Sequence, residues 1–403
     1  MAETTRGAEE EPSTGEDVNW PQAISQLQQE LYRWPGKEQI RRQLAVAHNN
    51  YGVDLGKQQQ WALAEGQLEE AMRLDKDNPQ FRDNLVNIRL NEAQSAYERH
   101  RLGEASQLID KAVALNPDAA PAYMLRGRVE YDRQHLKEAK TAWQRALELN
   151  PSQPEVEQWL GRVTEEFPVE SKFERLSQAS FDLRYEEQLE RPVGFDVRDA
   201  LLDARRSVGS DFSYWPGHKI VVLIYSAQRF RELRQETPDW VAGQFDGKIR
   251  VPLPDRQLDS RTVKRILFHE YTHALIHDLT SDRCPLWLNE GLAEFEGRNQ
   301  EPVPHVLLRR AREQQAVIPW SELSDHISAS RSAQDVGLAY EEAHSIVAFL
   351  LDRYSLWRIR RVLKSIGEGK SWEDVLNEEF HRKPNRLESD WQEWLPAFLA
   401  KEP

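Results

Sequence analysis

Apolar residues between Trp20 and Phe167 recur at the three- and four-residue intervals of amphipathic helices. The pattern then changes. Ser180–Tyr185 alternates in polarity and Lys219–Tyr225 is almost continuously apolar, and both patterns are typical of strands. Helical spacing returns afterwards, most clearly in Arg261–His277. The sequence therefore predicts an α+β fold, in which an all-helical N-terminal region precedes a domain with a small sheet and many helices.

Small residues repeat at matching offsets within the helical region. Ala112 and Ala146 stand 34 residues apart, and each is followed by an Asn-Pro pair. Ala71 precedes Ala112 by 41 residues, which implies an insertion of about seven residues in one unit. Small residues at such positions let paired helices approach closely. The pattern resembles the tetratricopeptide repeat (TPR), and this resemblance implies a solenoid that presents a concave surface to a protein partner.

The helix predicted at Arg261–His277 contains His-Glu-Tyr-Thr-His at positions 269–273. His269 and His273 lie one turn apart on one helical face, so both imidazoles can reach one metal ion. Glu270 is turned by about 100° from that face and can contact a water bound to the metal. This H-E-x-x-H arrangement is that of zinc metalloproteases. The alternative is a pair of exposed helical histidines beside an ordinary glutamate.

A second helical segment, Leu286–Glu296, supplies two further carboxylates. Zinc in a catalytic site requires a third protein ligand and one open position. Glu290 follows His273 by seventeen residues, which leaves room for a turn and a returning helix. Glu294 lies one helical turn beyond Glu290 and is suited to accept the remaining N–H of a ligating histidine. The apolar residues of this segment indicate a half-buried helix and argue against a merely solvated acidic face.

The two segments together, HEYTH followed by WLNEGLAEF, resemble the gluzincin metallopeptidases, and most closely their compact peptidase MA-like members. The resemblance implies a zincin-like domain that hydrolyses peptide bonds in a peptide or protein, as an endopeptidase. It also implies one Zn²⁺ ion bound by His269, His273 and Glu290. Glu270 is then the general base, and Glu294 orients the first histidine. The gap between the second and third ligands is shorter than in the aminopeptidases of this clan, which puts a close likeness to them in doubt.

The same resemblance implicates residues outside these segments. Gluzincins commonly place a tyrosine downstream of the third ligand, facing the oxyanion, and Tyr340 resembles it by position, with His344 one turn later. Core packing of Tyr340 is the alternative. In the family, the strand before the zinc helix is an edge that pairs with extended substrate, which implicates Gly247, Ile249 and Val251. A purely structural edge strand is the alternative, because main-chain pairing requires no particular side chain.

Composition and net charge limit the classes of partner to be expected. The 403 residues carry 53 Lys and Arg against 67 Asp and Glu, a net charge of −14, which argues against nucleic acid or an anionic membrane surface as a partner. The sequence contains no run of eighteen apolar residues, so it predicts no membrane-spanning helix. As encoded, the chain is expected in the cytoplasm, and in an exported protein the signal would have been removed. Cys284 is the single cysteine and is expected to be a turn residue, not a zinc ligand. His277 is expected to lie outside the ligand set.

The predicted organisation has four parts: a disordered tail at 1–17, TPR-like repeats at 18–167, a linker at 168–173 and a peptidase MA-like domain at 174–403. Two functions remain open. One is a zinc metallopeptidase whose repeats recruit a substrate or partner. The other is a non-catalytic interaction protein with a structural or silent metal domain. The presence of Glu270 favours the peptidase, since a silent domain has no need of the base.

Overall fold

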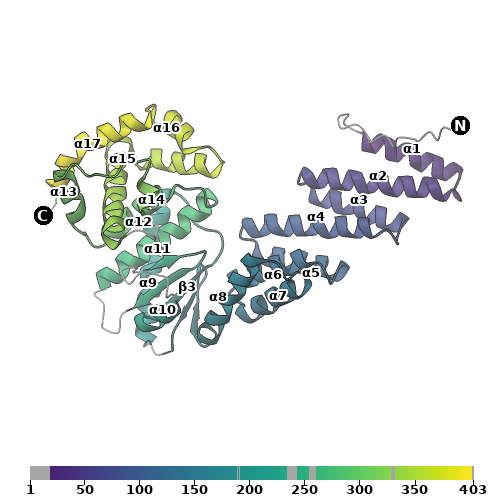
Figure 1. Ribbon diagram of the computed structural model, residues 1–403, viewed down its shortest axis with the longest axis horizontal. Helices are drawn as coiled ribbons and strands as arrows, with labels where there is room; N and C mark the ends of the chain where they lie inside the picture. Colours follow the sequence, from purple (N-terminus) through teal and green to yellow (C-terminus); the bar gives the residue numbers. More distant parts are fainter. Residues whose placement is uncertain are drawn as a thin grey trace, which may run out of the picture. The chain divides into compact units, whose positions relative to one another are not determined.

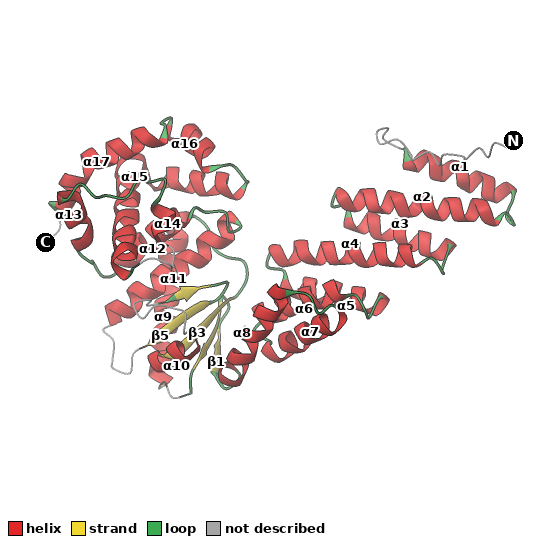
Figure 2. Cartoon of the chain, viewed as in Figure 1, coloured by secondary structure: helices red, strands yellow, loops and turns green. Residues whose placement is uncertain are grey.

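The computed structural model describes most of the chain, namely residues 19–187, 189, 191–233, 243–253, 260–327 and 332–401. The tail predicted at 1–17 lies outside the described residues. The rest divides into two compact units, one within Met1–Arg126 and Arg145–Ser152 and the other within Gly127–Gln144 and Gln153–Pro403. Helices dominate both units, and the strands belong to the second (Figures 1 and 2).

Helix pairs make up the first unit. Its helices are α1 (Trp20–Arg33), α2 (Glu38–Lys57), α3 (Trp61–Leu74), α4 (Pro79–Glu98) and α5 (Leu102–Leu115). The small residues that repeat along the sequence sit where helices meet, and Ala64, Ala71, Ala105 and Ala112 are all fully buried. A Cβ added at Gly52 of α2 would lie 2.8 Å from Cγ of Leu68 in α3. Close approach of paired helices therefore depends on these positions, as the repeat pattern predicts. Two further helices, α6 (Ala120–Asp132) and α7 (Leu136–Leu149), continue the pattern.

The second unit is built on a five-stranded sheet of order β1-β2-β3-β5-β4. The strands are β1 (Glu174–Ser177), β2 (Phe181–Tyr185), β3 (Ile220–Ser226), β4 (Gln244–Phe245) and β5 (Ile249–Leu253). The central strands β2, β3 and β5 run parallel, and β1 and β4 pair antiparallel at the two edges. Two helices, α9 (Arg191–Phe212) and α10 (Ala227–Leu233), occupy the connections around β3. The strands predicted at Ser180–Tyr185 and Lys219–Tyr225 are therefore confirmed.

Successive side chains of the sheet enter two different layers. Val222 and Ile249 belong to the main core, which the sheet shares with α9 and with α11 (Ser260–Thr280). Tyr225 lies on the opposite face, where it contacts Phe173 and Phe230. This second face also meets α8 (Pro154–Glu170), because the phenol of Tyr225 donates to the Glu170 carboxylate at 2.6 Å. The helix α8 continues through Pro168, so the first three residues of the predicted linker are helical.

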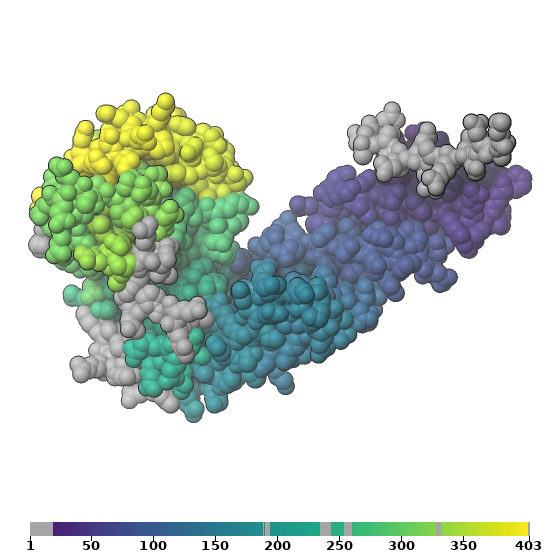
Figure 3. Space-filling view, viewed as in Figure 1, coloured from purple at the N-terminus to yellow at the C-terminus, as the bar shows by residue number. Residues whose placement is uncertain are grey.

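The remaining helices complete the core beside α11. They are α12 (Leu286–Arg298), α13 (Val306–Glu313), α14 (Leu323–Ile327), α15 (Ala333–Gly367), α16 (Trp372–Phe380) and α17 (Pro384–Leu399). The long helix α15 bends at Ser355, where φ of 66° and ψ of 159° interrupt the helical backbone. In the space-filling view, α16 and α17 (yellow) form a continuous surface with the green segments before them (Figure 3). No helix among the described residues has both the length and the apolar character to span a bilayer.

Candidate metal centre

Two packed helices, α11 and α12, bring together the three predicted ligands. The Nε2 atoms of His269 and His273 are 3.0 Å apart. Oε2 of Glu290 lies 3.5 Å from Nε2 of His269 and 3.3 Å from Nε2 of His273. One ligand atom from each residue falls within 4.8 Å of the other two. This is the donor set that the H-E-x-x-H motif and the downstream glutamate predict.

Glycine permits the close packing that places Glu290. A Cβ at Gly291 would lie 2.5 Å from the carbonyl oxygen of Ala343 in α15. A Cβ at Gly297 would lie 3.0 Å from the carbonyl oxygen of Arg265 in α11. Any larger residue at position 291 would push α12 away from α15, since backbone atoms cannot yield as a flexible side chain does.

The chemistry of the three donors fits a cation. Nδ1 of His269 faces the carboxylate of Glu294 at 3.2 Å and therefore carries its proton there, which leaves a lone pair on Nε2. Nδ1 of His273 faces Oδ1 of Asn289 at 3.0 Å, so its Nε2 is likewise an electron-pair donor. Oε2 of Glu290 is buried and faces both Nε2 atoms. Three converging lone pairs repel one another unless a positive charge lies between them, and two imidazoles with one carboxylate are a common zinc set.

The pKa values of His269 and Glu290 also indicate a site that favours a positive charge. Burial alone would lower the pKa of His269, but hydrogen bonds to Glu290 and Glu294 raise it to about 10. Burial would raise the pKa of Glu290, but the charge of His273 and the hydrogen bond from His269 lower it to about 2. The site thus stabilises a cation, which either a proton or a metal ion supplies.

The predicted base lies beside the ligands and outside their set. Glu270 is 3% exposed, and its Oε2 has no hydrogen-bond partner among the described residues. Burial raises the pKa of this carboxyl, and the positive charges of His269 and His273 partly oppose that effect. Gly243, at the start of the β4 hairpin, packs against it, because a Cβ there would lie 2.7 Å from Cδ of Glu270. A carboxylate with an unpartnered oxygen next to a metal site is suited to exchange a proton with a bound water.

Residues around the ligands fix the two imidazoles. Glu294 accepts a hydrogen bond from His269 and another, 2.6 Å long, from Nε of Arg298. Glu294 and Arg298 lie one turn apart on α12. Asn289 holds His273. Sequence reasoning missed Asn289 and Arg298. Arg298 follows Glu294 by four residues, the spacing of a helical ion pair, so its contact could have been predicted. Asn289 directly precedes the third ligand, but this position alone does not indicate a contact with His273.

We expect Glu294→Ala to weaken zinc binding by about 10–100-fold without removing a ligand, since His269 loses the acceptor that sets its tautomer. Competition with a zinc chelator measures this affinity. The matched control is Glu301→Ala. Glu301 forms an ion pair of 3.2 Å with Arg265, which lies on α11 like His269, and this pair involves no histidine. Equal zinc affinity in the two variants would rule out an orienting role for Glu294.

Tyr340 lies within the electrostatic field of the site. Burial raises the pKa of its hydroxyl, and the carboxylates of Glu290, Glu270 and Glu294 raise it further. A tyrosine that stays neutral beside three carboxylates remains a hydrogen-bond donor. His344, one turn later on α15, is buried, and its Nδ1 is 2.8 Å from Nε2 of another histidine, His305.

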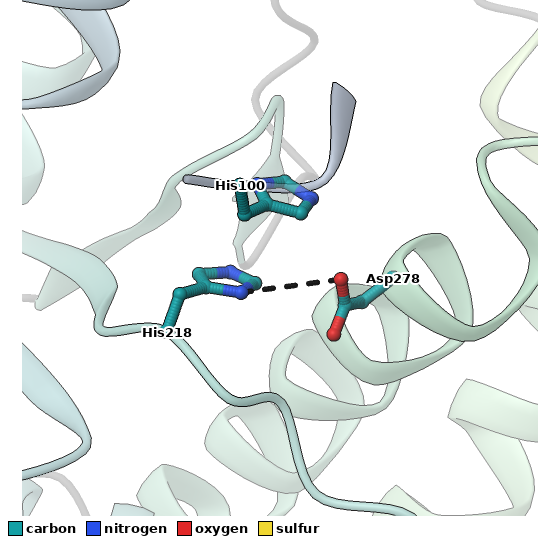
Figure 4. Close-up of side chains that lie close together, drawn as sticks. All are labelled: His100, His218 and Asp278. Carbon is teal, nitrogen blue, oxygen red and sulfur yellow. Dashed lines mark ion pairs between the residues drawn. The ribbon is translucent and has the colours of Figure 1, made fainter. Parts of the chain in front are cut away.

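Other candidate residues lie outside the ligand group. Cys284 and His277 contribute no atom to it, and the His277 ring packs edge-on against Phe245, with centroids 5.3 Å apart. Further along α11, Asp278 lies 3.9 Å from Nδ1 of His218 (Figure 4). This ion pair fastens the loop after α9 to α11.

The strand predicted at the sheet edge, with Gly247, Ile249 and Val251, is at Ile249 an inner strand of the described sheet. Ile249 of β5 pairs with Val222 of β3 on one side and with Phe245 of β4 on the other. Ile249 and Val251 are fully buried, and Gly247, with φ of +91°, forms the turn between the two strands. That turn folds Gln244 and Phe245 back along β5, so β4 is the outer strand of the sheet formed by the described residues. A strand of two residues is too short for hydrophobic periodicity to reveal.

The fold and the site together define a chain that joins TPR-like helices to a protease-like domain of the MA type. Residues 256–397 match the Peptidase MA superfamily, and residues 120–153 match the tetratricopeptide repeat. The first match contains all three candidate ligands and Glu270. The predicted resemblance to MA-like peptidases and to the tetratricopeptide repeat is thus confirmed. No curated protein matches the chain significantly.

Proposed function

We propose that the protein is a zinc-dependent metallopeptidase in which His269, His273 and Glu290 hold the metal. The observation that carries this proposal is the convergence of three electron-pair donors, two of them fixed by Glu294 and Asn289 on their far sides. Membership of residues 256–397 in the Peptidase MA superfamily supports it, since peptidases of that superfamily are typically zinc-dependent.

Bound zinc lowers the pKa of a coordinated water toward neutrality and polarises a carbonyl group. The protein supplies the proton transfers. Glu270 accepts a proton from the attacking water and returns it to the leaving amine, and the burial that raises its pKa improves it as a base near neutral pH. Tyr340, held neutral by burial and by the surrounding carboxylates, donates its hydroxyl to the developing oxyanion.

The outer edge of β4 is the proposed place for the substrate. An extended peptide can add to a free sheet edge through main-chain hydrogen bonds. Gly243 leads into β4 and contacts Glu270, so a peptide along this edge passes beside the base. This assignment replaces the one made for β5. The TPR region is proposed to recruit a protein, which is either the substrate or a partner.

Elemental analysis of the purified protein tests the metal site. We expect about one zinc per chain in the wild type and loss of zinc in His269→Ala, His273→Ala and Glu290→Ala, because each change removes one of three ligands. The control is His277→Ala, which removes a histidine from the next turn of the same helix, outside the ligand group. Full zinc content in all three ligand variants would contradict the site. Absence of cleavage by the zinc-loaded wild type in a mixed peptide library would instead favour a non-catalytic interaction protein.

A further inference from the structure

A buried polar cluster lies on the face of the sheet that meets α8. Its cations are Arg162, Lys248 and Arg250, and its carboxylates are Asp246, Glu166 and Glu170. Charged side chains are rarely buried unless they are paired. Arg250 is 0% exposed, and Lys248 and Glu170 are each 1% exposed. The two arginines pair directly with these carboxylates.

Arg250 of β5 contacts two different parts of the chain. Its Nη1 donates to Oε1 of Glu170 at 2.8 Å and to the phenol of Tyr225 at 2.5 Å. Its Nη2 donates to the phenol of Tyr131 at 3.0 Å, and Tyr131 in turn donates to Glu166 at 2.7 Å. Glu166 and Glu170 belong to α8, and Tyr131 belongs to α6, within the matched repeat. One guanidinium therefore joins a sheet strand to α8 and to the end of the repeat region.

Lys248 makes a second connection of the same kind. Its ammonium donates to Oε1 of Gln134 at 2.6 Å and lies 3.6 Å from the centroid of the Tyr131 ring. Gln134 also donates to Glu170 at 2.5 Å. Asp246, in the turn before Lys248, forms an ion pair with Arg162 of α8. The turn that joins β4 to β5 is thus held by α8 and by residues of the repeat.

The opposite face of this hairpin, residues 243–253, contacts the metal helix. Ile249 belongs to the core shared with α11. Phe245 packs on the His277 ring, and Gly243 packs against Glu270. The hairpin is therefore enclosed between the helix that carries the ligands and the buried polar cluster.

We propose that Tyr131, Gln134, Glu166 and Glu170 are positioning residues, which fix the 243–253 hairpin so that strand β4 is held beside Glu270 for the binding of an extended peptide. The inference rests on the proposed function for its substrate. It gives the repeat at 120–153 a role in forming the peptidase site, in addition to any recruitment of a partner. Loss of one contact should loosen the hairpin and weaken peptide binding, while the ligands on α11 and α12 stay in place.

Hydrogen exchange of the full-length, metal-free protein tests the positioning without reference to catalysis. Tyr131→Phe removes the hydroxyl that links Arg250 to Glu166 and keeps the ring beside Lys248. We expect amides of 243–253 to exchange about 5–10-fold faster, as the loss of one buried hydrogen bond implies. The control is Tyr185→Phe, which removes another phenol–carboxylate bond, 2.7 Å long to Glu174, at the far side of the same sheet. It should leave the hairpin unchanged.

A second variant, Lys248→Met, removes the other connection and should also accelerate exchange of the hairpin. It provides the test if Tyr131→Phe does not fold. Unaltered exchange at 243–253 in the folded variants would overturn the positioning role.

Steady-state kinetics test the consequence for the substrate. In zinc-loaded Tyr131→Phe, KM for a peptide long enough to lie along β4 should rise on the order of tenfold, with zinc content preserved and kcat little changed. A merely destabilising change would reduce the active fraction and leave KM unaltered, and that result would overturn the substrate part of the proposal. If the zinc-loaded wild type cleaves no peptide, the proposed function fails and the substrate part fails with it. The exchange result still decides, by itself, whether the cluster positions the hairpin.

Discussion

Replacement of Glu270 by glutamine should lower turnover by about 10²–10⁴-fold, the usual contribution of a positioned general base. Glutamine preserves the size of the side chain and removes its basicity. Glu270 contributes no atom to the ligand group, so zinc content and the unfolding transition should match those of the wild type. Cleavage of a peptide library followed by mass spectrometry measures the effect before any single substrate is known.

The neighbouring helix offers a matched control for this substitution. Glu296 of α12 is also buried, its Oε1 has no hydrogen-bond partner among the described residues, and burial raises its pKa to about 8. Glu296→Gln changes a buried carboxyl of similar chemistry that lies outside the ligand group. It should leave turnover unaltered. Equal rates for Glu270→Gln and the wild type would show that Glu270 is not the base.

A fragment that begins at Ser171 should fail to fold, although the sequence places a linker there. The cut removes Glu166, Glu170 and Tyr131 and leaves Arg250 buried in the sheet without these partners. Breaking a buried ion pair by removal of one partner costs about 3–5 kcal/mol, against a typical total stability of about 5–15 kcal/mol. A fragment that begins at Ala120 retains these partners and should fold and bind zinc. Circular dichroism and gel filtration of the two fragments distinguish these outcomes.

A rescue variant of the shorter fragment separates the buried charge from other causes of failure. Lys248→Met and Arg250→Met together replace both cations with apolar side chains of similar length. Replacement of buried charges by apolar groups is often neutral or stabilising, so the doubly substituted fragment should regain solubility at least in part. A stable, zinc-binding fragment from Ser171 without these substitutions would show that the repeat end is dispensable for the fold.

The grouping of the candidate ligands was predictable because their relationships are local. His269 and His273 are separated by one helical turn, and Glu290 and Glu294 by another, so each pair follows from the helical period alone. Only the packing of α11 against α12, which brings the two pairs together, had to be learned from the structure. Asn289 acts through a side chain adjacent in sequence to Glu290, but nothing in the sequence indicates that it faces His273.

The buried polar cluster could not be predicted in the same way. Arg250 and Tyr131 are 119 residues apart in the sequence, and their contact depends on the packing of α8 and α6 against the sheet. Lys248 and Arg250 alternate with apolar residues and therefore read as the solvent-facing positions of a strand. Pro168 suggested the end of a helix, but α8 extends to Glu170, whose carboxylate is held by Arg250. Tertiary contacts override the local signal at that point.

Repeat arrays usually gain, lose and exchange units freely, because each unit contacts only its immediate neighbours. The unit at 120–153 does not share this freedom. The preceding unit has Tyr97 and His100 at the positions of Tyr131 and Gln134, and the unit before that has Gly56 and Gln59. Neither unit carries both residues, so in a transplanted copy Lys248 or Arg250 would lose its partner. The array can therefore be lengthened or shortened only before residue 120, and the last unit and the protease-like domain must be inherited together.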